Sequence, residues 1–192
     1  MRADDAILTT DRLVVRRFTA SDGPGLHACL SRPGAVEYEP YAPVGPAEAD
    51  ALAGERAADP RFRAVQTHAG TLVGNLYLAS SGPDWWHTWE LGYVFHPDHW
   101  GRGYATEACR TLLDAVFADG AHRVVAHCNP ANVRSWALLE RLGMRREGHA
   151  VRAAAFSRNA RGRPVWHDAY SYAVLDEEWG PDGRTRGGEA EG

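Results

Sequence analysis

A glycine pair between an apolar run and a long amphipathic segment is the stretch best suited to chemistry. Trp100-Gly101-Arg102-Gly103-Tyr104-Ala105 follows an apolar run that ends at Pro97. If the run is a strand and the following segment a helix, the first N–H groups of that helix have no partner within it. Gly101 and Gly103 lack a Cβ, so an anion can approach the main chain closely. Together with the positive end of the helix dipole, this spacing predicts a phosphate site.

Two better-known glycine-rich phosphate sites fit the sequence less well. A dinucleotide fingerprint needs a third glycine and an acidic residue about 20 residues later. Thr106 stands in the place of that glycine, and His127-Cys128-Asn129 occupies the place of the acid. The sequence contains no lysine, which excludes a P-loop and Schiff-base chemistry. A dinucleotide oxidoreductase therefore remains only a distant alternative.

Local patterns predict the elements that position this turn. Strands are expected at residues 13–18, 62–67, 71–79, 85–95, 123–127, 144–155 and 165–175. One helix is expected to be capped by Ser21 or Asp22 and to stop near Pro33-Gly34, and others are expected at 47–59, from the glycine turn as far as Asp119, and from Asn129 or Asn132 to Gly143. His68-Ala69-Gly70 reads as a hairpin turn. This order of elements favours one mixed α/β domain.

The strand and helix beside the glycine turn have clear faces. Alternation along residues 89–95 places Glu90 with Gly92 and Val94, a face of small neighbours, opposite Trp89, Leu91, Tyr93 and Phe95. From Ala105 to Val116, apolar residues recur at i, i+3, i+4, i+7, i+8 and i+11, which indicates a helix packed on a sheet.

Composition limits the partners and the compartment. A net charge of −4 without a basic stripe argues against nucleic-acid binding. Cys29, Cys109 and Cys128 are odd in number and show no C-x-x-C spacing, as in reduced cytosolic proteins. No segment has the length of a signal peptide core or a membrane span. We therefore expect a cytoplasmic protein that does not bind membranes, as a monomer or a homodimer. His96 and His99 lack a third ligand, so no metal is expected.

Two signatures in order give the sequence a family resemblance. Glu90-Leu91-Gly92-Tyr93-Val94 followed by residues 100–108 resembles the acetyl-CoA-binding segment of the GNAT acetyltransferase superfamily. Asn132, Ser135 and residues 138–144 resemble the second signature of that superfamily. With residues 8–13 and 166–175, the chain resembles the branch that contains the ribosomal-protein N-terminal acetyltransferases. The resemblance covers residues 8–179, and residues 1–7 and 180–192 are expected to be flexible termini.

The resemblance implies a fold and a cofactor. The fold is a single mixed α/β domain, with a twisted, mostly antiparallel sheet split beside a central parallel strand pair and helices on both faces. The resemblance implies that acetyl-CoA is the co-substrate. Its pyrophosphate is expected on the N–H groups of Gly101, Arg102, Gly103, Tyr104, Ala105 and Thr106. The main chain of Val94 and Phe95 is expected to bind its pantetheine arm. Asn132 is expected as both helix cap and cofactor contact, and the Arg102 side chain can add charge to the phosphates.

The chemistry requires a neutral amine, an oxyanion donor and a protonated leaving thiol. Glu90 is the candidate general base, acting through a water. Ser135 is the candidate proton donor to the thiolate, because Leu139 stands where the family often has a tyrosine. A backbone N–H near Val94 or Phe95 would stabilise the oxyanion. The acceptor pocket is expected among aromatic side chains, namely Tyr38, Tyr41, Trp85, Trp86 and Trp89.

Three functions remain open from the sequence. The first is acetyl transfer to a protein N-terminal α-amine by direct attack. The second is acetyl transfer to a small amine, such as an aminoglycoside. The third is an acyl-CoA-binding sensor module that performs no catalysis.

Overall fold

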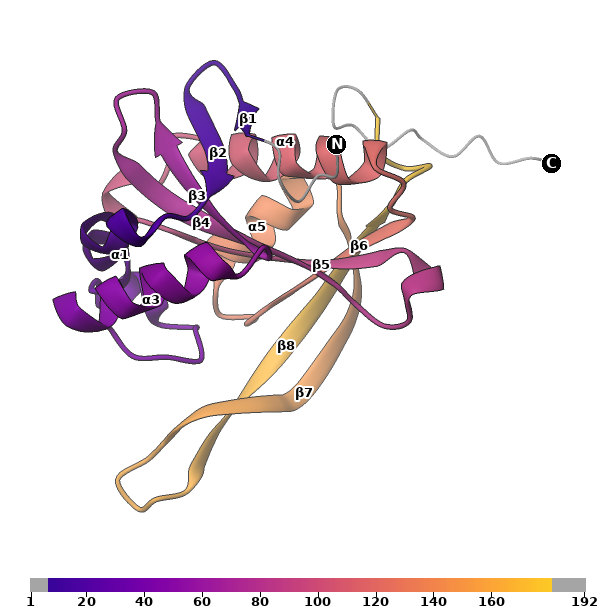
Figure 1. The fold of residues 1–192 in the computed structure, drawn as a ribbon. Helices are drawn as coiled ribbons and strands as arrows, with labels where there is room; N and C mark the ends of the chain where they lie inside the picture. Colours follow the sequence, from indigo (N-terminus) through magenta and orange to yellow (C-terminus); the bar gives the residue numbers. More distant parts are fainter. Residues whose placement is uncertain (1–6, 181–192) are drawn as a thin grey trace.

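A twisted eight-stranded sheet runs through the protein, with strand order β1-β2-β3-β4-β5-β6-β8-β7 (Figure 1). The computed structural model describes residues 7–180, so the predicted flexibility of residues 1–6 and 181–192 lies outside the described part. The strands are β1 (Leu8–Thr9), β2 (Leu13–Arg17), β3 (Phe62–Thr67), β4 (Leu72–Ser80), β5 (Thr88–Phe95), β6 (Arg123–Cys128), β7 (Arg145–Arg158) and β8 (Pro164–Leu175).

Helices cover both faces of this sheet. They are α1 (Gly23–Leu30), α2 (Pro33–Val36), α3 (Pro46–Ala58), α4 (Tyr104–Ala118) and α5 (Val133–Arg141). In Figure 1, α1 and α3 lie on one side of the sheet, and α4 and α5 on the other. Three short 3-10 turns, η1 (Ala20–Asp22), η2 (Asp84–Trp86) and η3 (Pro97–His99), complete the elements.

The sheet has a single parallel pairing, between β5 and β6. All its other pairings are antiparallel. The predicted fold class is therefore confirmed: one mixed α/β domain, mostly antiparallel, with a central parallel pair and helices on both faces.

The alternation of β5 divides the hydrophobic core as predicted. Leu91 and Phe95 pack with α4 and α5 in the larger core. Val94, on the opposite face, packs with α1 and α3 in the smaller one. In α4, the predicted stripe is buried at Ala108, Cys109, Leu112, Leu113 and Val116. Because α4 is fixed along this stripe, its N-terminus is held at the end of β5.

The structure differs from three local predictions. Trp85 and Trp86 lie in the turn η2 and not in a strand, because Pro83 starts the turn and His87 leaves it in the left-handed region with φ 45°. Pro33 begins the short helix α2, since proline suits a first helical position. Asp22 is the N-cap residue of α1 as expected, but its side chain makes no cap hydrogen bond, because it binds Arg16 instead.

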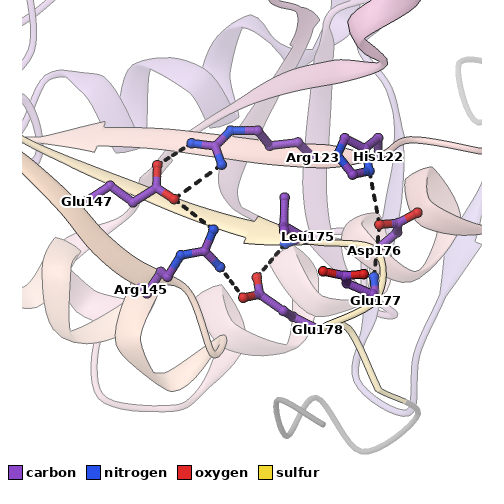
Figure 2. Close-up of polar contacts among 8 residues, drawn as sticks. All are labelled: His122, Arg123, Arg145, Glu147, Leu175, Asp176, Glu177 and Glu178. Carbon is purple, nitrogen blue, oxygen red and sulfur yellow. Dashed lines mark hydrogen bonds and ion pairs between the residues drawn. The ribbon is translucent and has the colours of Figure 1, made fainter. Parts of the chain in front are cut away.

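The C-terminal end of the sheet is held by ion pairs that cross a strand. Figure 2 shows Glu147 of β7 between the guanidinium groups of Arg123 and Arg145. Arg123 belongs to β6, so its contact with Glu147 spans the intervening strand β8. Glu178 pairs with Arg145 and accepts a hydrogen bond of 2.8 Å from the Leu175 N–H. The turn after β8 is thereby fixed to the edge of the sheet.

Two further observations concern the cysteines and the lengths of the helices. All three cysteines are free and buried. Among residues 7–180, no helix has the length and apolarity needed to cross a membrane.

Candidate active site

A cleft opens where β5 and β6 separate. The two strands pair only from Thr88 to Glu90, opposite Arg123 to Val125. Beyond Glu90, β5 continues to pair with β4 as far as Phe95, and its other edge faces the opening. The cleft has a volume of about 1390 Å³ and is lined by residues of β5, α4, α5 and the segment after α2. Glu90 therefore marks the point at which the sheet divides.

The glycine turn leaves its main-chain donors available. Gly101 and Gly103 have φ values of 73° and 80°, a region that L residues rarely adopt. Gly103 is the N-cap of α4, so the next N–H groups point out of the helix end. Within residues 7–180, no protein acceptor takes a hydrogen bond from the N–H groups of 101–106. The turn can thus receive an anion at the mouth of the cleft.

Arg12 braces this turn, a role that the sequence did not reveal. Its Nε donates to Glu107 at 2.7 Å, and its Nη1 donates to the Arg102 carbonyl at 2.9 Å. The guanidinium also lies 4.9 Å from the ring centroid of Tyr104. Glu107 is held from the other side by the Thr10 hydroxyl. Because Arg12 itself lines the cleft, it adds positive charge beside the free N–H groups.

Further cationic side chains gather near the same end. Arg110, Arg134 and Arg141 line the cleft, whereas Arg102 does not. The guanidinium of Arg134 lies 4.6 Å from the Trp100 ring centroid. The position of Trp100 is fixed in turn, because its Nε1 donates to the Phe95 carbonyl at 2.8 Å. That bond occupies a main-chain acceptor in the stretch predicted to bind pantetheine.

The two predicted catalytic side chains line the same cleft. Glu90 comes from β5, and Ser135 from the first turn of α5. Asn132 caps α5, since its side chain accepts a hydrogen bond of 3.2 Å from the Ser135 N–H. The Ser135 Oγ lies 2.8 Å from the Tyr93 hydroxyl. Hydrogen bonds to Tyr93 of β5 and to Asn132 at the start of α5 therefore hold Ser135 in place.

Tyr93 and Cys128 surround Ser135 and were not predicted to act there. The Tyr93 hydroxyl donates to the Ser135 carbonyl at 3.1 Å. Burial raises the pKa of Tyr93 well above its ordinary value, and the bond to Ser135 offsets only part of this. Burial also raises the pKa of Cys128 to about 11, again partly offset by Ser135. Both groups are therefore neutral at physiological pH, so the Tyr93 hydroxyl remains a donor.

The five aromatic residues predicted for the acceptor pocket are not brought together. Tyr38 lines the cleft, and its hydroxyl lies 3.5 Å from the Ala131 carbonyl. Tyr41 packs against the core between α1 and α3, and Trp89 against the opposite core. Trp85 and Trp86 line a separate hollow of about 610 Å³.

This hollow adjoins the cleft. His127 lines both of them, so an elongated molecule that enters the cleft at Glu90 can continue toward the two tryptophans.

Glu39 is a cleft residue that the sequence analysis missed. It is half-buried after α2 and lines the cleft with Glu90 and Ser135. Burial raises the pKa of Glu39 to about 7, while the charge of Arg56 and the side chain of Tyr41 act in the opposite direction. No sequence signal marks this residue, because α3 supplies Arg56 from a distant part of the chain.

His96 and His99 lie at the two ends of the turn η3. His96 accepts a hydrogen bond from the Asp98 N–H through its Nδ1. Across the described part of the chain, no three His, Cys, Asp or Glu side chains are grouped so that they could hold a metal ion.

The chain is similar to several known acetyltransferases. The family model described as acetyltransferase (GNAT) domain matches residues 12–145. An uncharacterized N-acetyltransferase of Bacillus subtilis, YnaD, is 30% identical over 175 residues, covering 90% of this chain and 98% of that protein. A solved GNAT-family acetyltransferase from Bacillus anthracis shares 28% identity with a TM-score of 0.79, covering 90% of this chain and 99% of that one.

A more distant structure shares the fold. The ribosomal-protein-S5-alanine acetyltransferase from Vibrio fischeri has a TM-score of 0.75 at 18% identity, covering 92% of this chain and 100% of that one.

Proposed function

Because the chain belongs to the GNAT family of N-acetyltransferases, which use acetyl-CoA, we propose that it acetylates a primary amine, preferably a protein N-terminal α-amine, by direct attack. The observation that carries this proposal is the end of the β5–β6 pairing at Glu90. That break brings Glu90, the proposed general base, into a cleft that also offers the free N–H groups of the glycine turn and several arginines.

The cofactor is proposed to lie along β5 and the glycine turn. The N–H groups of residues 101–106 hold the pyrophosphate, with Arg12 beside them, and the Arg102 side chain is available from outside the cleft lining. The pantetheine arm is proposed to pair with the open edge of β5. The bonds Ser81–Thr88 and His96–Val73 show that Val94 directs its N–H and carbonyl to Asn75 of β4, so the main chain of Tyr93 and Phe95 faces the opening instead. Since Trp100 already occupies the Phe95 carbonyl, the Phe95 N–H is the group that remains of the predicted pair. Asn132 holds the start of α5 against the same arm.

The chemical step follows from these positions. Glu90, through a water, takes a proton from the attacking nitrogen. A backbone N–H of β5 stabilises the oxyanion of the tetrahedral intermediate. When the C–S bond breaks, the Ser135 hydroxyl protonates the departing thiolate. Tyr93 holds the Ser135 Oγ in place for this step.

An α-amine suits this site better than a lysine side chain. Its ordinary pKa of ~7.7–8.0 leaves a useful neutral fraction at pH 7, whereas a lysine at ~10.4 is almost fully charged. The hollow beyond His127 gives a peptide chain a path away from Glu90, with Trp85 and Trp86 as its walls. We place the reaction in the cytoplasm, where the three free thiols stay reduced.

A thiol-release assay tests the proposal. Acetyl-CoA is offered with a peptide that has a free N-terminal alanine, with spermidine and with kanamycin. We expect the peptide to release the most thiol, and Glu90→Gln to lower kcat by ~10²-fold. Glu55→Gln, the same change at an exposed position of α3, serves as the matched control and should leave the rate unchanged.

The other outcomes have defined meanings. Turnover of spermidine or kanamycin alone would replace the peptide with a small amine as acceptor. Calorimetric binding of acetyl-CoA without thiol release from any of the three amines would identify a sensor module and contradict the proposed catalysis.

A further inference from the structure

Glu39 has a fixed place within the reaction cleft. It lies three residues beyond α2, and its N–H donates to the Val36 carbonyl at 3.0 Å, which ties the backbone to the end of that helix. Its side chain lines the same cleft as Glu90 and Ser135. It also interacts electrostatically with Tyr93, the residue that holds Ser135. Glu39 therefore shares the cleft with the proposed base and the proposed proton donor, and its charge is felt at Tyr93.

The surroundings of Glu39 leave its charge without a direct ionic partner. Arg56 of α3 and Tyr41 of the segment after α2 act on the Glu39 carboxylate, and Glu39 interacts in turn with Tyr93 of β5. Cys29 of α1 acts on Tyr41 and Arg56. Arg56 is only 4% exposed. Within residues 7–180, neither its Nε nor its Nη1 has a hydrogen-bond partner, and no ion pair joins it to Glu39.

Aromatic rings hold the Arg56 guanidinium in place. The Arg56 guanidinium lies 4.7 Å from the Phe62 ring centroid and 5.6 Å from that of Phe18. Such stacking stabilises the cation where it is. A cationic acceptor that enters the cleft can therefore pair with the half-buried Glu39 carboxylate, because no side chain of residues 7–180 forms an ion pair with it.

The reaction needs two deprotonations before the product forms. An amine reaches the enzyme largely as an ammonium ion and must lose one proton to become a nucleophile. After the C–N bond forms, the nitrogen is again cationic and loses a second proton as the C–S bond breaks. One base can receive only one of these protons at a time. Glu90 accounts for the second, so without a further base the first must be lost to solvent before the amine attacks.

We propose that Glu39 takes the first proton from the bound ammonium group, and that Glu90 takes the second from the tetrahedral intermediate. In the first step the ammonium becomes a neutral amine and Glu39 a carboxylic acid. The amine then attacks the thioester carbonyl, Glu90 accepts the second proton, and Ser135 protonates the thiolate. Glu39 and Glu90 return their protons to solvent and to Ser135, so one proton is released per turnover. This inference rests on the proposed function.

The raised pKa of Glu39, about 7, suits this task. A base is most effective when its pKa is near the operating pH. Glu39 is then deprotonated in a large fraction of molecules at neutral pH, yet it holds a proton much better than an exposed glutamate at ~4.3.

Kinetics with two acceptors test the assignment. kcat/KM is measured from pH 5.5 to 9.5 with the alanine-initiated peptide and with methoxyamine, a primary amine that is uncharged at neutral pH. With the peptide we expect Glu39→Gln to lose ~10²-fold at low pH, shrinking to about 3-fold or less at pH 9 as the amine deprotonates by itself. With methoxyamine the loss should stay below about 3-fold throughout.

Control variants separate this role from a structural one. Glu55→Gln should match the wild type, and Glu39→Asp, which keeps the carboxylate, should recover part of the peptide activity. The affinity of Glu39→Gln for acetyl-CoA should be unchanged. A ¹³C carboxyl resonance that titrates near pH 7 should vanish in Glu39→Gln.

Each contrary result identifies what has failed. An equal loss for both acceptors at every pH, or no loss at all, would overturn the role of Glu39 while the acetyltransferase assignment stands. If the wild type releases thiol with neither acceptor, the proposed function fails and this inference fails with it.

Discussion

The Tyr93 hydroxyl lies 2.8 Å from the Ser135 Oγ and 3.1 Å from the Ser135 carbonyl oxygen. These bonds join β5 to α5 across the cleft. A phenol has one hydrogen and two acceptor lone pairs. If that hydrogen goes to the carbonyl, the serine hydroxyl donates to Tyr93; if it goes to the Oγ, the serine hydrogen is free for the thiolate. Tyr93 therefore controls whether Ser135 can act as a proton donor.

Substitutions of Ser135 and Tyr93 should lower kcat by different factors. Ser135→Ala removes the donor and should lower kcat by ~10²-fold. Tyr93→Phe keeps the serine and the intrahelical partner of its part-buried carbonyl, so losing the second donor should cost only ~0.5–1.5 kcal/mol of stability. Its kcat should fall by only about 10-fold, because the Oγ can still reach the thiolate. Steady-state kinetics with acetyl-CoA in excess checks this order. A larger kcat loss for Tyr93→Phe than for Ser135→Ala would make the tyrosine the donor.

The glycine turn can be tested by a matched pair of substitutions. Gly103 has a φ of 80°, and a Cβ added there would lie 3.3 Å from an Arg12 nitrogen. Gly103→Ala should cost about 1–2 kcal/mol in backbone strain and raise the Kd for acetyl-CoA by ~10-fold. Gly120 has a φ of 93° and open space around it at the other end of α4.

Gly120→Ala is therefore the control for strain alone. It should lower the melting temperature as much as Gly103→Ala while leaving the Kd unchanged. Calorimetric titration with acetyl-CoA measures the Kd of both variants. If Gly103→Ala binds acetyl-CoA as tightly as the wild type, the phosphates of the cofactor do not bind at this turn.

The local parts of the fold could be predicted because their signals are local. The faces of β5 follow from strict alternation over residues 89–95, and the stripe of α4 from a helical period that is sustained from Ala105 to Val116. The Asn132 cap is a contact over three residues. The same reasoning failed at Trp85 and Trp86, where an aromatic run resembled a strand but Pro83 and the left-handed His87 made a turn.

The contacts that complete the site could not be predicted, because they join distant parts of the chain. Arg12 meets Glu107 across 95 residues, and Tyr93 meets Ser135 across 42. Neither residue of such a pair has a local pattern that names its partner. The environment of Glu39 depends in the same way on α3 packing beside α1. Composition and periodicity determine the elements, whereas the pKa of Glu39 depends on how those elements pack.

The buried pair between Arg16 and Asp22 predicts how stability depends on pH. Asp22 accepts two bonds from the guanidinium, at 2.7 and 2.8 Å, and is 8% exposed. Burial raises the pKa of Asp22, but the bonds from Arg16 and Thr19 outweigh it, so the net pKa is lowered. Its contribution to stability is therefore full above the unfolded value of ~3.9 and is lost as the pH falls through the folded value.

Asp22→Asn should remove this contribution. Breaking this half-buried pair should cost ~1–3 kcal/mol at pH 7, because Arg16 is 22% exposed and keeps its bonds to Gln66. The free-energy gap between variant and wild type should narrow toward pH 3. Asp98 pairs with Arg32 at the surface and is 63% exposed, so Asp98→Asn should cost less than about 1 kcal/mol. Urea unfolding at both pH values gives the comparison. A pH-independent gap for Asp22→Asn would mean that packing, and not charge, holds this position.

The hollow at Trp86 predicts a dependence on the length of the acceptor. By alternation, Thr88 lies on the same face of β5 as Glu90, and Glu90 pairs with Val125 of β6. Thr88 and Val125 both line the hollow. An acceptor whose amine reaches Glu90 therefore extends over these residues toward Trp86. The Trp86 ring is held close to Gly82, where an added Cβ would lie 2.6 Å away, so it offers an ordered surface.

Trp86→Ala should raise KM about 10-fold for the alanine-initiated peptide, which corresponds to losing ~1.4 kcal/mol of contact, and should leave KM for methoxyamine unchanged. Trp166 of β8 is a suitable control, since it is 54% exposed, close to the 56% of Trp86, and lines neither the cleft nor the hollow. Trp166→Ala should change neither KM. If the two variants raise the peptide KM equally, the effect is general to exposed tryptophans and the acceptor does not cross the hollow. If only Trp86→Ala acts, and only on the peptide, the chain of the acceptor leaves the cleft past His127.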